Sequence, residues 1–391
     1  MNKQELIREF EKTYGAGGEI VTVFSPGRVN LIGEHTDYNG GHVFPCALTI
    51  GTYFAARKRN DTKVQFYSGN FPRQGIVERD IVTDLEFNRR KGFSNYPMGM
   101  VWTYARNGMQ ADCGFDVYIW GNIPNASGLS SSASIEVGMG KVLNELFGFE
   151  VPNLQIALYG QYSENNYNGV NCGIMDQFAI AMGKKDCAMF LDTATLQYEY
   201  APIRLDGMKI VISCTNKKRG LADSKYNERR AECEEALSEL QKELPIQALG
   251  ELTEAEFEAH KDLIADPVRV RRARHAVYEN QRTIKAVELL KSGDIEGFGK
   301  LMNESHLSTK DDYEVTGIEL DTLAEESWKI DGCIGARMTG AGFGGCAVAI
   351  VRDEAVANYI QTVGAKYLEK IGYAADFYVV EIGDGTYVLK K

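Results

Sequence analysis

The chain has 391 residues, of which 44% are hydrophobic and 25% charged, as in a globular protein long enough for two domains. Its net charge of −11 argues against a nucleic-acid or membrane partner, because both require basic surfaces. A polyanionic ligand would need a local positive site made of backbone amides, a metal ion and a few arginines or lysines.

The first half of the chain mixes extended and helical segments. Alternating or continuous apolar runs predict strands in IVTVFSP, HVFPCALTIGTYFAARK, KVQFYSG and FDVYIWG. Helical spacing of apolar residues predicts helices near 2–14, 96–108, 135–146, 152–167 and 174–182. The helix near 135–146 follows directly on a loop of small residues, PNASGLSSSAS.

A second unit begins near GMKIVISC, with a domain boundary near residue 205 that divides the chain into 1–205 and 206–391. Helices are predicted near 222–243, 269–292, 294–304, 317–328 and 354–371, and strands in CAVAIVR and DFYVVEI. Strands and helices are mixed in both units without regular βαβ alternation, which indicates the α+β class.

The eight cysteines are scattered and form no C-x-x-C pair, so neither a zinc site nor a redox motif is indicated. Their density is far below that of a disulfide scaffold, and we expect reduced thiols in a cytoplasmic protein. The charged, amphipathic N-terminus does not resemble a signal peptide, and no apolar run approaches membrane-spanning length.

The loop PNASGLSSSAS, residues 124–134, combines small residues with the start of a helix. Free N–H groups and the helix dipole attract anions at such a position, and the serine hydroxyls add donors and a possible metal ligand. The alternative is a serine-rich cap on a core helix. No Walker A motif occurs in the chain.

The segment GRVNLIGEHTDYNGG, residues 27–41, places Arg28, Glu34, His35 and Asp37 beside glycines. Carboxylates next to tight turns suit a sugar, because each accepts hydrogen bonds from several hydroxyls. A charged surface turn is the alternative, although the apolar flanks of the segment favour a lined pocket.

Two further carboxylates stand in unusual surroundings. Asp176 follows an apolar pair in GVNCGIMDQF, residues 169–178, where an unpaired charge would be costly to bury. A helix cap or a structural ion pair would explain it equally well. Glu164, in YSENNYNG, ends a helical stretch from which its carboxylate could reach a cation.

The segment RMTGAGFGGCAVAIV, residues 337–351, contains a G-x-G-x-x-G spacing. A dinucleotide fingerprint must follow a strand and open a helix, whereas this one runs into the strand-like CAVAIV. We therefore interpret it as a glycine-rich turn close to a ligand or another loop.

Taken together and in this order, the segments resemble the galactose-phosphorylating members of the GHMP small-molecule kinase family. GRVNLIGEHTDYNGG is similar to the family's sugar signature, GLSSSAS to its phosphate loop, CGIMDQF to its catalytic-aspartate segment, SKYNERRAEC to its sugar-binding tyrosine segment and MTGAGFGG to its third glycine motif. The resemblance implies a two-domain fold, with a ribosomal-S5-domain-2-like N-terminal domain, a ferredoxin-like C-terminal domain and the active site between them.

The resemblance also implies an ATP-dependent phosphorylation of galactose with Mg²⁺, and no obligate protein partner. Asp176 and Arg28 would be catalytic, and Ser132 and Glu164 would ligate Mg²⁺. The residues that would hold galactose are Glu34, His35, Thr36, Asp37, Gly173, Asp176 and Tyr226. Those that would bind ATP are Ser68 and, in the phosphate loop, Ala126, Ser127, Gly128, Leu129, Ser130, Ser131 and Ser132. Family members often carry glycine where this loop has Ala126 and Ser127.

Two alternatives stay open at this point. One is a kinase of another sugar, such as N-acetylgalactosamine or arabinose, within the same family. The other is a sugar sensor that binds ATP and galactose without turnover. The complete GLSSSAS segment favours an enzyme, since such sensors carry a damaged phosphate loop.

Overall fold

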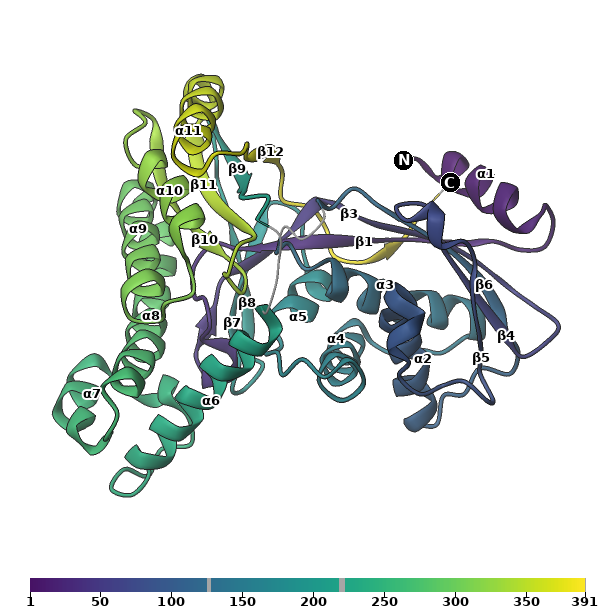
Figure 1. Cartoon of the computed structure of the whole chain (residues 1–391), viewed down its shortest axis with the longest axis horizontal. Helices are drawn as coiled ribbons and strands as arrows, with labels where there is room; N and C mark the ends of the chain where they lie inside the picture. The colour runs from purple at the N-terminus through teal and green to yellow at the C-terminus, as the bar shows by residue number, and fades with distance from the viewer. Residues whose placement is uncertain (125–127, 218–221, 391) are drawn as a thin grey trace.

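The structure is a computed structural model that describes residues 1–124, 128–217 and 222–390. Within these residues the strands form three sheets, and the helices pack against them without a regular βαβ alternation (Figure 1). The α+β class predicted from the sequence is therefore confirmed.

The largest sheet lies in the first half of the chain and has six strands in the order β13-β1-β3-β6-β4-β5. Side chains alternate across it, as the two-residue period of a strand requires. In the long strand β3, Ala55 packs under the N-terminal helix, whereas Phe54 and Ala56 face the core on the opposite side. The strands are β1 (Val21–Asn30), β3 (Pro45–Lys58), β4 (Lys63–Ser68), β5 (Val77–Asp80), β6 (Phe115–Gly121) and β13 (Tyr387–Val388).

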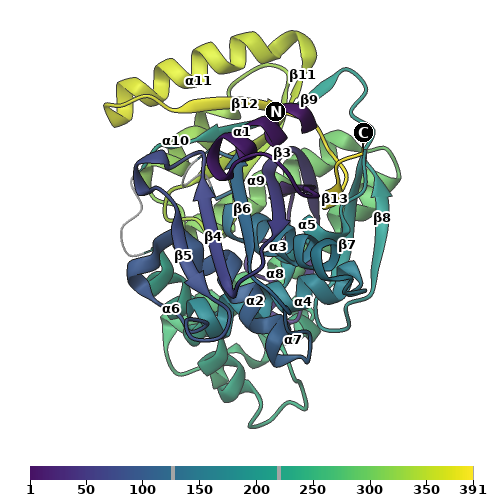
Figure 2. The same ribbon diagram turned by 90° about the vertical axis from the view of Figure 1, so that its right-hand side faces the viewer.

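Helices cover both faces of this sheet (Figures 1 and 2). Helix α1 lies alone on one face, and four helices, α2 to α5, lie on the other, where they bury the main core of the first half. The helices are α1 (Lys3–Tyr14), α2 (Asn95–Arg106), α3 (Ser131–Phe147), α4 (Asn153–Ser163) and α5 (Met175–Met182).

The second half contains a four-stranded antiparallel sheet in the order β10-β11-β9-β12. Among the described residues, one strand is followed by five α-helices, two strands, a helix and a further strand, which is a ferredoxin-like arrangement with additional helices in its first crossover. The strands are β9 (Met208–Cys214), β10 (Cys333–Thr339), β11 (Cys346–Arg352) and β12 (Asp376–Val380).

The other elements of the second half are mostly long helices that extend beyond the sheet (Figure 1). Helices α8 and α9 pack along each other, and α9 also packs against β10. The helices are α6 (Ala222–Leu240), α7 (Glu254–His260), α8 (Pro267–Lys291), α9 (Ile295–Asp311), α10 (Ile318–Ser327) and α11 (Val356–Ile371). A small third sheet joins β2 (His42–Val43), β7 (Cys187–Asp192) and β8 (Tyr198–Pro202).

The long, periodic segments were predicted correctly in type, and the short ones were not. Six short elements were not predicted from the sequence: β5, β7, β8, β10, α7 and β13. Strand β13 is two residues long and pairs with β1, Val23 opposite Val388, so the end of the chain returns to the first sheet. Such a pairing depends on tertiary packing and leaves no periodic pattern in the sequence.

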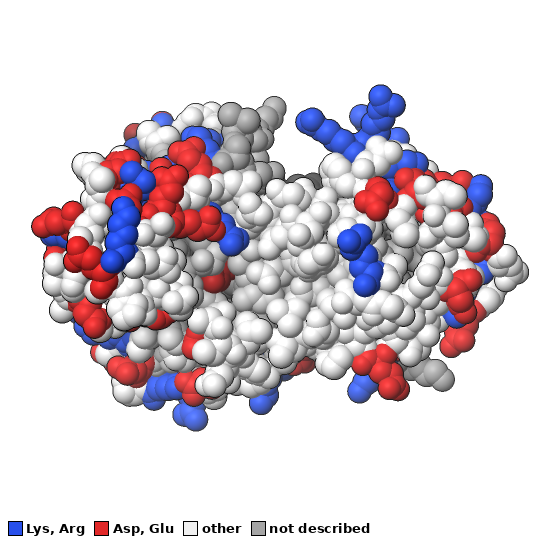
Figure 3. All heavy atoms as spheres, turned by 90° about the horizontal axis from the view of Figure 1, so that it is seen from below, with Lys and Arg blue, Asp and Glu red and all other residues white. Residues whose placement is uncertain are grey.

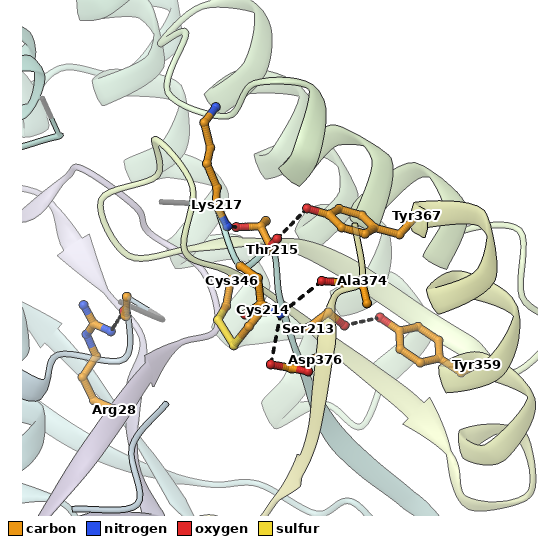
Figure 4. The surroundings of a disulfide bond; sticks show 12 residues. Arg28, Ser213, Cys214, Thr215, Lys217, Cys346, Tyr359, Tyr367, Ala374 and Asp376 are labelled. Atoms are coloured by element: carbon orange, nitrogen blue, oxygen red, sulfur yellow. Dashed lines mark hydrogen bonds between the residues drawn. A yellow bond between two sulfur atoms is a disulfide. The ribbon is translucent and has the colours of Figure 1, made fainter. Parts of the chain in front are cut away.

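The prediction of eight reduced thiols is wrong for two cysteines. Cys214 at the end of β9 and Cys346 at the start of β11 form a disulfide (Figure 4). They occupy directly opposed positions of two antiparallel strands, with 4.2 Å between their Cα atoms. The two cysteines are 132 positions apart in the sequence, so no local pattern indicates that they are neighbours. The other six cysteines are free.

The charged side chains on one face of the molecule can be followed in Figure 3. Acidic and basic side chains are intermingled there, with uncharged atoms between them (Figure 3). Among the described residues, no helix is both long and apolar enough to cross a membrane.

Candidate active site

A cavity of about 230 Å³ lies where the first half of the chain meets the second. Its wall includes β1, the loop after it, the start of α3, the start of α5, α6 and the turn between β10 and β11. The lining residues are Arg28, Glu34, His35, Asp37, Tyr96, Gly128, Ser130, Ser131, Ser132, Glu164, Val170, Cys172, Gly173, Met175, Asp176, Gln177, Tyr226, Gly340 and Ala341.

Arg28 reaches the cavity from a break in strand pairing. The register between β1 and β3 shifts between Pro26 and Arg28, and such a bulge re-aims the side chain that follows it. The guanidinium is buried, and its Nε donates to Asp176 Oδ1 at 2.7 Å while Nη1 donates to the Gly128 carbonyl at 2.7 Å. Among the residues that the structure describes, Arg28 is the only Lys or Arg in the lining, and it is fixed between a carboxylate and the loop before α3.

Asp176 lies in the first turn of α5, where the free N–H groups of the helix favour a carboxylate. Its second oxygen, Oδ2, accepts a hydrogen bond from the Ser130 hydroxyl. Ser130 has a φ of 60°, a left-handed conformation that turns the chain directly into α3. Asp176 is thus held from two sides, and 29% of its side chain remains exposed to the cavity.

The N-terminus of α3 opens into the same cavity. Ser131 and Ser132 begin the helix and line the wall, so the first N–H groups of α3 are directed toward the cavity. A dipole and several unpaired donors make this an anion site of the kind that binds phosphates.

The opposite wall carries polar groups suited to a sugar. Asp37 lies against Gly173, and a Cβ atom at that glycine would come within 1.9 Å of the Asp37 carboxylate. Glycine is therefore required at 173 for this approach. The ring of Tyr226 lies 5.5 Å, between centroids, from the rings of both His35 and Tyr38.

Glu34 is almost completely buried, with 1% exposure, at the back of the cavity. Its Oε2 accepts from Arg337 Nη1 at 2.6 Å and from Asn30 Nδ2 at 3.0 Å. Its Oε1 accepts from the Gly340 N–H at 2.6 Å. Burial raises the pKa of Glu34 and Arg337 opposes this, so the ion pair is what makes a buried carboxylate tolerable here.

His35 is neutral at physiological pH. Burial is the main reason that its pKa falls from 6.5 to about 3, and the neighbouring His275 lowers it further. The Ala341 carbonyl, 3.2 Å from Nε2, can only accept, so Nε2 carries the proton and Nδ1 accepts from the Tyr38 hydroxyl at 2.8 Å. His35 is thereby held as an oriented polar group rather than as a cation.

Oxygen ligands for a divalent cation lie at the end of the cavity nearest α3. Ser132 and Glu164 both line the wall, and Glu164 opens a π-helical segment, Glu164–Asn168, that continues from α4. Behind them lies Glu136, which is fully buried, and its pKa is raised by burial and then by Glu164. Among the residues that the structure describes, no group of three or more His, Cys, Asp or Glu side chains could hold a metal.

Most residues implied by the resemblance meet in this one cavity. Those that line it are Arg28, Glu34, His35, Asp37, Gly128, Ser130, Ser131, Ser132, Glu164, Gly173, Asp176 and Tyr226. Thr36 is buried beside it and donates to the Gly33 and His42 carbonyls. Ser68 ends β4 and, like Leu129, is not part of the lining. Ala126 and Ser127 lie outside the described residues.

Several lining residues were not expected from the sequence. Gln177 adjoins Asp176, and Cys172 and Met175 flank the same segment, so the CGIMDQF motif could have indicated them. Tyr96 lies in an ordinary amphipathic helix, and nothing in its sequence surroundings indicates that it lines the cavity. Gly340 and Ala341 belong to the glycine-rich turn whose approach to a ligand or loop was expected, and the turn indeed leads into a strand rather than a helix.

Family comparisons agree with the two halves of the fold. Residues 95–184 match the GHMP kinases N terminal domain, and residues 286–369 match the GHMP kinases C terminal domain. Residues 8–58, which contain Arg28 and the loop after β1, match the galactokinase galactose-binding signature. The chain is thus a kinase with the two-domain GHMP fold, and as such it uses ATP.

Relatives that match over nearly their whole length show to which branch of the GHMP kinases the chain belongs. The chain is 60% identical to the galactokinase of Clostridium acetobutylicum over 93% of each chain, and 57% identical to that of Clostridium beijerinckii over 98% of each. It superposes on the crystal structure of Lactococcus lactis galactokinase complexed with galactose with a TM-score of 0.96 and 52% identity, covering 98% of this chain and 99% of the other. The chain belongs to the galactokinases, and it is an enzyme of galactose metabolism.

The electrostatics of Asp37 yield a testable consequence for stability. Burial, and then the nearby Asp176, raise the pKa of Asp37 from 3.8 to about 6. Between these two values the folded state binds a proton that the unfolded state does not, so the stability of the wild type falls as the pH rises from about 4 to 6. We expect Asp37→Asn to remove this loss and to raise the free energy of unfolding at pH 7.5 by about 1–2 kcal/mol without ligands.

Urea unfolding of both proteins at pH 4.5 and pH 7.5 measures the effect. The stabilisation should be full at pH 7.5 and clearly smaller at pH 4.5, where the folded state keeps the proton of Asp37. Asp112→Asn is the matched control, because that side chain is 77% exposed and should change little at either pH. An equal difference at both pH values would mean that Asp37 does not titrate in this range.

Proposed function

We propose that the enzyme transfers the γ-phosphoryl group of ATP to the anomeric hydroxyl of α-D-galactose, giving galactose 1-phosphate and ADP. This is the first committed step of galactose use by the Leloir pathway. The observation that carries the proposal is the juxtaposition of Asp176, Arg28 and Ser130 at the N-terminus of α3, directly beside the polar wall of Asp37, Gly173 and Tyr226.

Galactose would bind against the loop after β1. Carboxylates at Glu34, Asp37 and Asp176 accept hydrogen bonds from sugar hydroxyls, and neutral His35 and Tyr226 supply a partly apolar ring surface. Gly173 allows the close approach of Asp37, which keeps that carboxylate in the cavity wall. Thr36 would act indirectly, because its hydroxyl holds the loop closed through the Gly33 and His42 carbonyls.

ATP would bind with its phosphates at the start of α3, in the phosphate loop of residues 126–132. The N-terminal N–H groups of the helix and the Arg28 guanidinium provide the local positive charge that this acidic chain otherwise lacks. Ser68 would contact the nucleotide farther from the reacting groups.

Asp176 would orient the reacting hydroxyl. Its Oδ1 is committed to Arg28, whereas its Oδ2 is bonded to the mobile proton of a serine hydroxyl and can accept one from the sugar instead. Because phosphoryl transfer passes through a loose transition state, positioning and charge neutralisation contribute most of the catalysis. Arg28 would stabilise the charge on the transferring group, and Asp176 would point the hydroxyl at it and take its proton late.

Mg²⁺ fits the oxygen donors at the end of the cavity. Ser132 and Glu164 offer a hydroxyl and a carboxylate, and Mg²⁺ is commonly held by one or two protein ligands together with phosphate oxygens and water. Burial, and then the charge of Glu164, raise the pKa of Glu136, and a cation at Glu164 would offset the second of these effects. When bound, the ion would neutralise charge on the ATP phosphates.

We further propose that residues 1–205 and 206–391 form the two domains, since the GHMP N- and C-terminal matches fall on either side of this boundary. We place the reaction in the cytoplasm, where ATP is available. No obligate protein partner is required, because one chain supplies every residue of the proposed site.

A sugar panel tests the proposed reaction. We expect galactose 1-phosphate as the product with galactose, and kcat/KM lower by about 100-fold or more with glucose, because the wrong epimer leaves a buried polar group of the pocket unpaired. Coupled ADP release across galactose, glucose, N-acetylgalactosamine and arabinose, with the product identified by NMR, provides the measurement. Higher kcat/KM on another sugar would reassign the substrate, and binding of ATP and galactose without ADP release would indicate a sensor.

Asp176→Asn should lower kcat more than tenfold, a barrier increase of at least about 1.4 kcal/mol, while leaving the fold intact. The change is nearly isosteric and removes the charge that orients the hydroxyl. Galactose affinity by calorimetry should stay within a few-fold, and the thermal midpoint serves as the folding control. A variant that keeps more than about a tenth of the wild-type kcat would show that Asp176 is only the structural partner of Arg28.

Glu164→Gln should weaken the Mg²⁺ dependence and phosphoryl transfer far more than galactose binding. A neutral amide is a poorer ligand for a hard cation than a carboxylate. The experiment titrates Mg²⁺ at fixed ATP and measures galactose affinity separately by calorimetry. An unchanged Mg²⁺ response would make Glu164 a mere helix-end residue, and an equal loss of sugar binding would mean general damage to the site.

Glu136→Gln is the matched control for that experiment. Its carboxyl group lies beside Glu164 but outside the cavity lining, so its replacement should disturb the Mg²⁺ response less. A larger effect at Glu136 than at Glu164 would mean that Glu136, and not Glu164, is the Mg²⁺ ligand.

A further inference from the structure

The loop after β1 is fastened by its backbone to helix α8 of the second half. Glu279 Oε1 accepts from two successive peptide groups, the Gly33 N–H at 3.0 Å and the Glu34 N–H at 3.3 Å. His275, one turn earlier on α8, donates from Nε2 to the Glu34 carbonyl at 3.0 Å, because a carbonyl can only accept. The peptide groups on both sides of the Glu34 Cα are therefore bound by one face of one helix.

Glu279 is charged and fully buried, and it is outside the cavity lining. Burial alone would raise its pKa, but Arg282 and then Arg337 outweigh this and lower the pKa to about 2. A buried carboxylate is strongly destabilising unless it is paired and hydrogen-bonded. Its two N–H partners are likewise buried, and they would lose their acceptor with it.

The backbone that Glu279 and His275 hold is not in a relaxed conformation. Gly33 has a φ of 94° and His35 a φ of 58°, so Glu34 is flanked on both sides by left-handed residues. Such conformations persist only where the surroundings fix them. From the other end, Arg337 and the Gly340 N–H hold the Glu34 carboxylate. All of these contacts come from the second half of the chain, and Asn30 Nδ2 adds one from β1 to Oε2 at 3.0 Å.

The residues proposed for catalysis are held by contacts from a different part of the chain. Arg28, Gly128, Ser130 and Asp176 bond to one another, and all of them belong to the first half. The sugar side of the cavity thus depends on α8, whereas the phosphate side depends on β1, α3 and α5. A perturbation of α8 should accordingly affect one substrate and spare the other.

We propose that Glu279 and His275 are positioning residues for galactose, which set the place and orientation of Glu34 from outside the cavity. This rests on the proposed role of Glu34 in sugar binding. The residues touch neither substrate, and their effect is transmitted through the Gly33 and Glu34 peptide groups.

The test measures KM for each substrate in Glu279→Gln and His275→Ala. We expect KM for galactose to rise about tenfold or more in Glu279→Gln, because a small displacement of a binding group is costly. KM for ATP, and kcat at saturating galactose, should stay within about threefold of the wild type. His275→Ala should shift KM for galactose in the same direction, and it carries the test alone if Glu279→Gln does not fold.

Two further variants make the result specific. Val363→Ala, a fully buried core position on α11, controls for general destabilisation and should lower the thermal midpoint with both KM values unchanged. Glu34→Gln should raise KM for galactose by itself, and Glu279→Gln added to it should have little further effect, since both act through the same carboxylate.

The outcomes separate the two hypotheses. If Glu34→Gln leaves KM for galactose unchanged, the proposed sugar site is wrong and the inference falls with it. If Glu34→Gln raises KM but the α8 variants leave it unchanged, or raise both KM values equally, the sugar site stands and the positioning role is overturned.

Discussion

The ion pair between Arg28 and Asp176 is the constraint on which the geometry of the site depends. A guanidinium with 3% exposure is tolerated only where its donors are satisfied, and here they bind a carboxylate on α5 and the Gly128 carbonyl before α3. The Arg28 N–H also donates to the Leu129 carbonyl at 3.2 Å. One side chain and its own peptide group thus bring a strand, a loop and a helix to a common point in the wall of the cavity.

A second buried ionic cluster, made of Glu34, Arg337, Glu279 and Arg282, performs the same task for the opposite wall. The two clusters differ in where their members come from. The first is contained in residues 28–176, whereas the second joins the loop after β1 to α8 and β10. Because low-dielectric surroundings make each unpaired charge expensive, both clusters hold their loops more rigidly than apolar packing would. The cavity is therefore defined by polar contacts on both sides of the boundary between the two halves.

Sequence reasoning reached the first cluster but only Glu34 of the second, for a physical reason. Arg28, Asp176 and the serines stand in short segments of unusual composition, which are visible without any knowledge of contacts. Glu279 and His275 lie inside α8, a 25-residue helix with many charged residues, and nothing in its pattern distinguishes them from solvent-exposed positions. The disulfide between Cys214 and Cys346 was missed for a related reason, since strand pairing alone brings the two residues together. Long periodic elements could be predicted, whereas the two-residue β13 could not, because its pairing partner decides its conformation.

The distribution of positive charge explains how so acidic a chain can bind a nucleotide triphosphate. The segment of residues 124–134 has no lysine or arginine, and Arg28 is the only Lys or Arg that the cavity lining contains within the described part of the chain. The guanidinium is partly neutralised by Asp176, so the N-terminus of α3 must supply much of the remaining attraction. A helix dipole is fixed in direction and needs no reorganisation when the phosphates arrive, which suits a reaction limited by positioning.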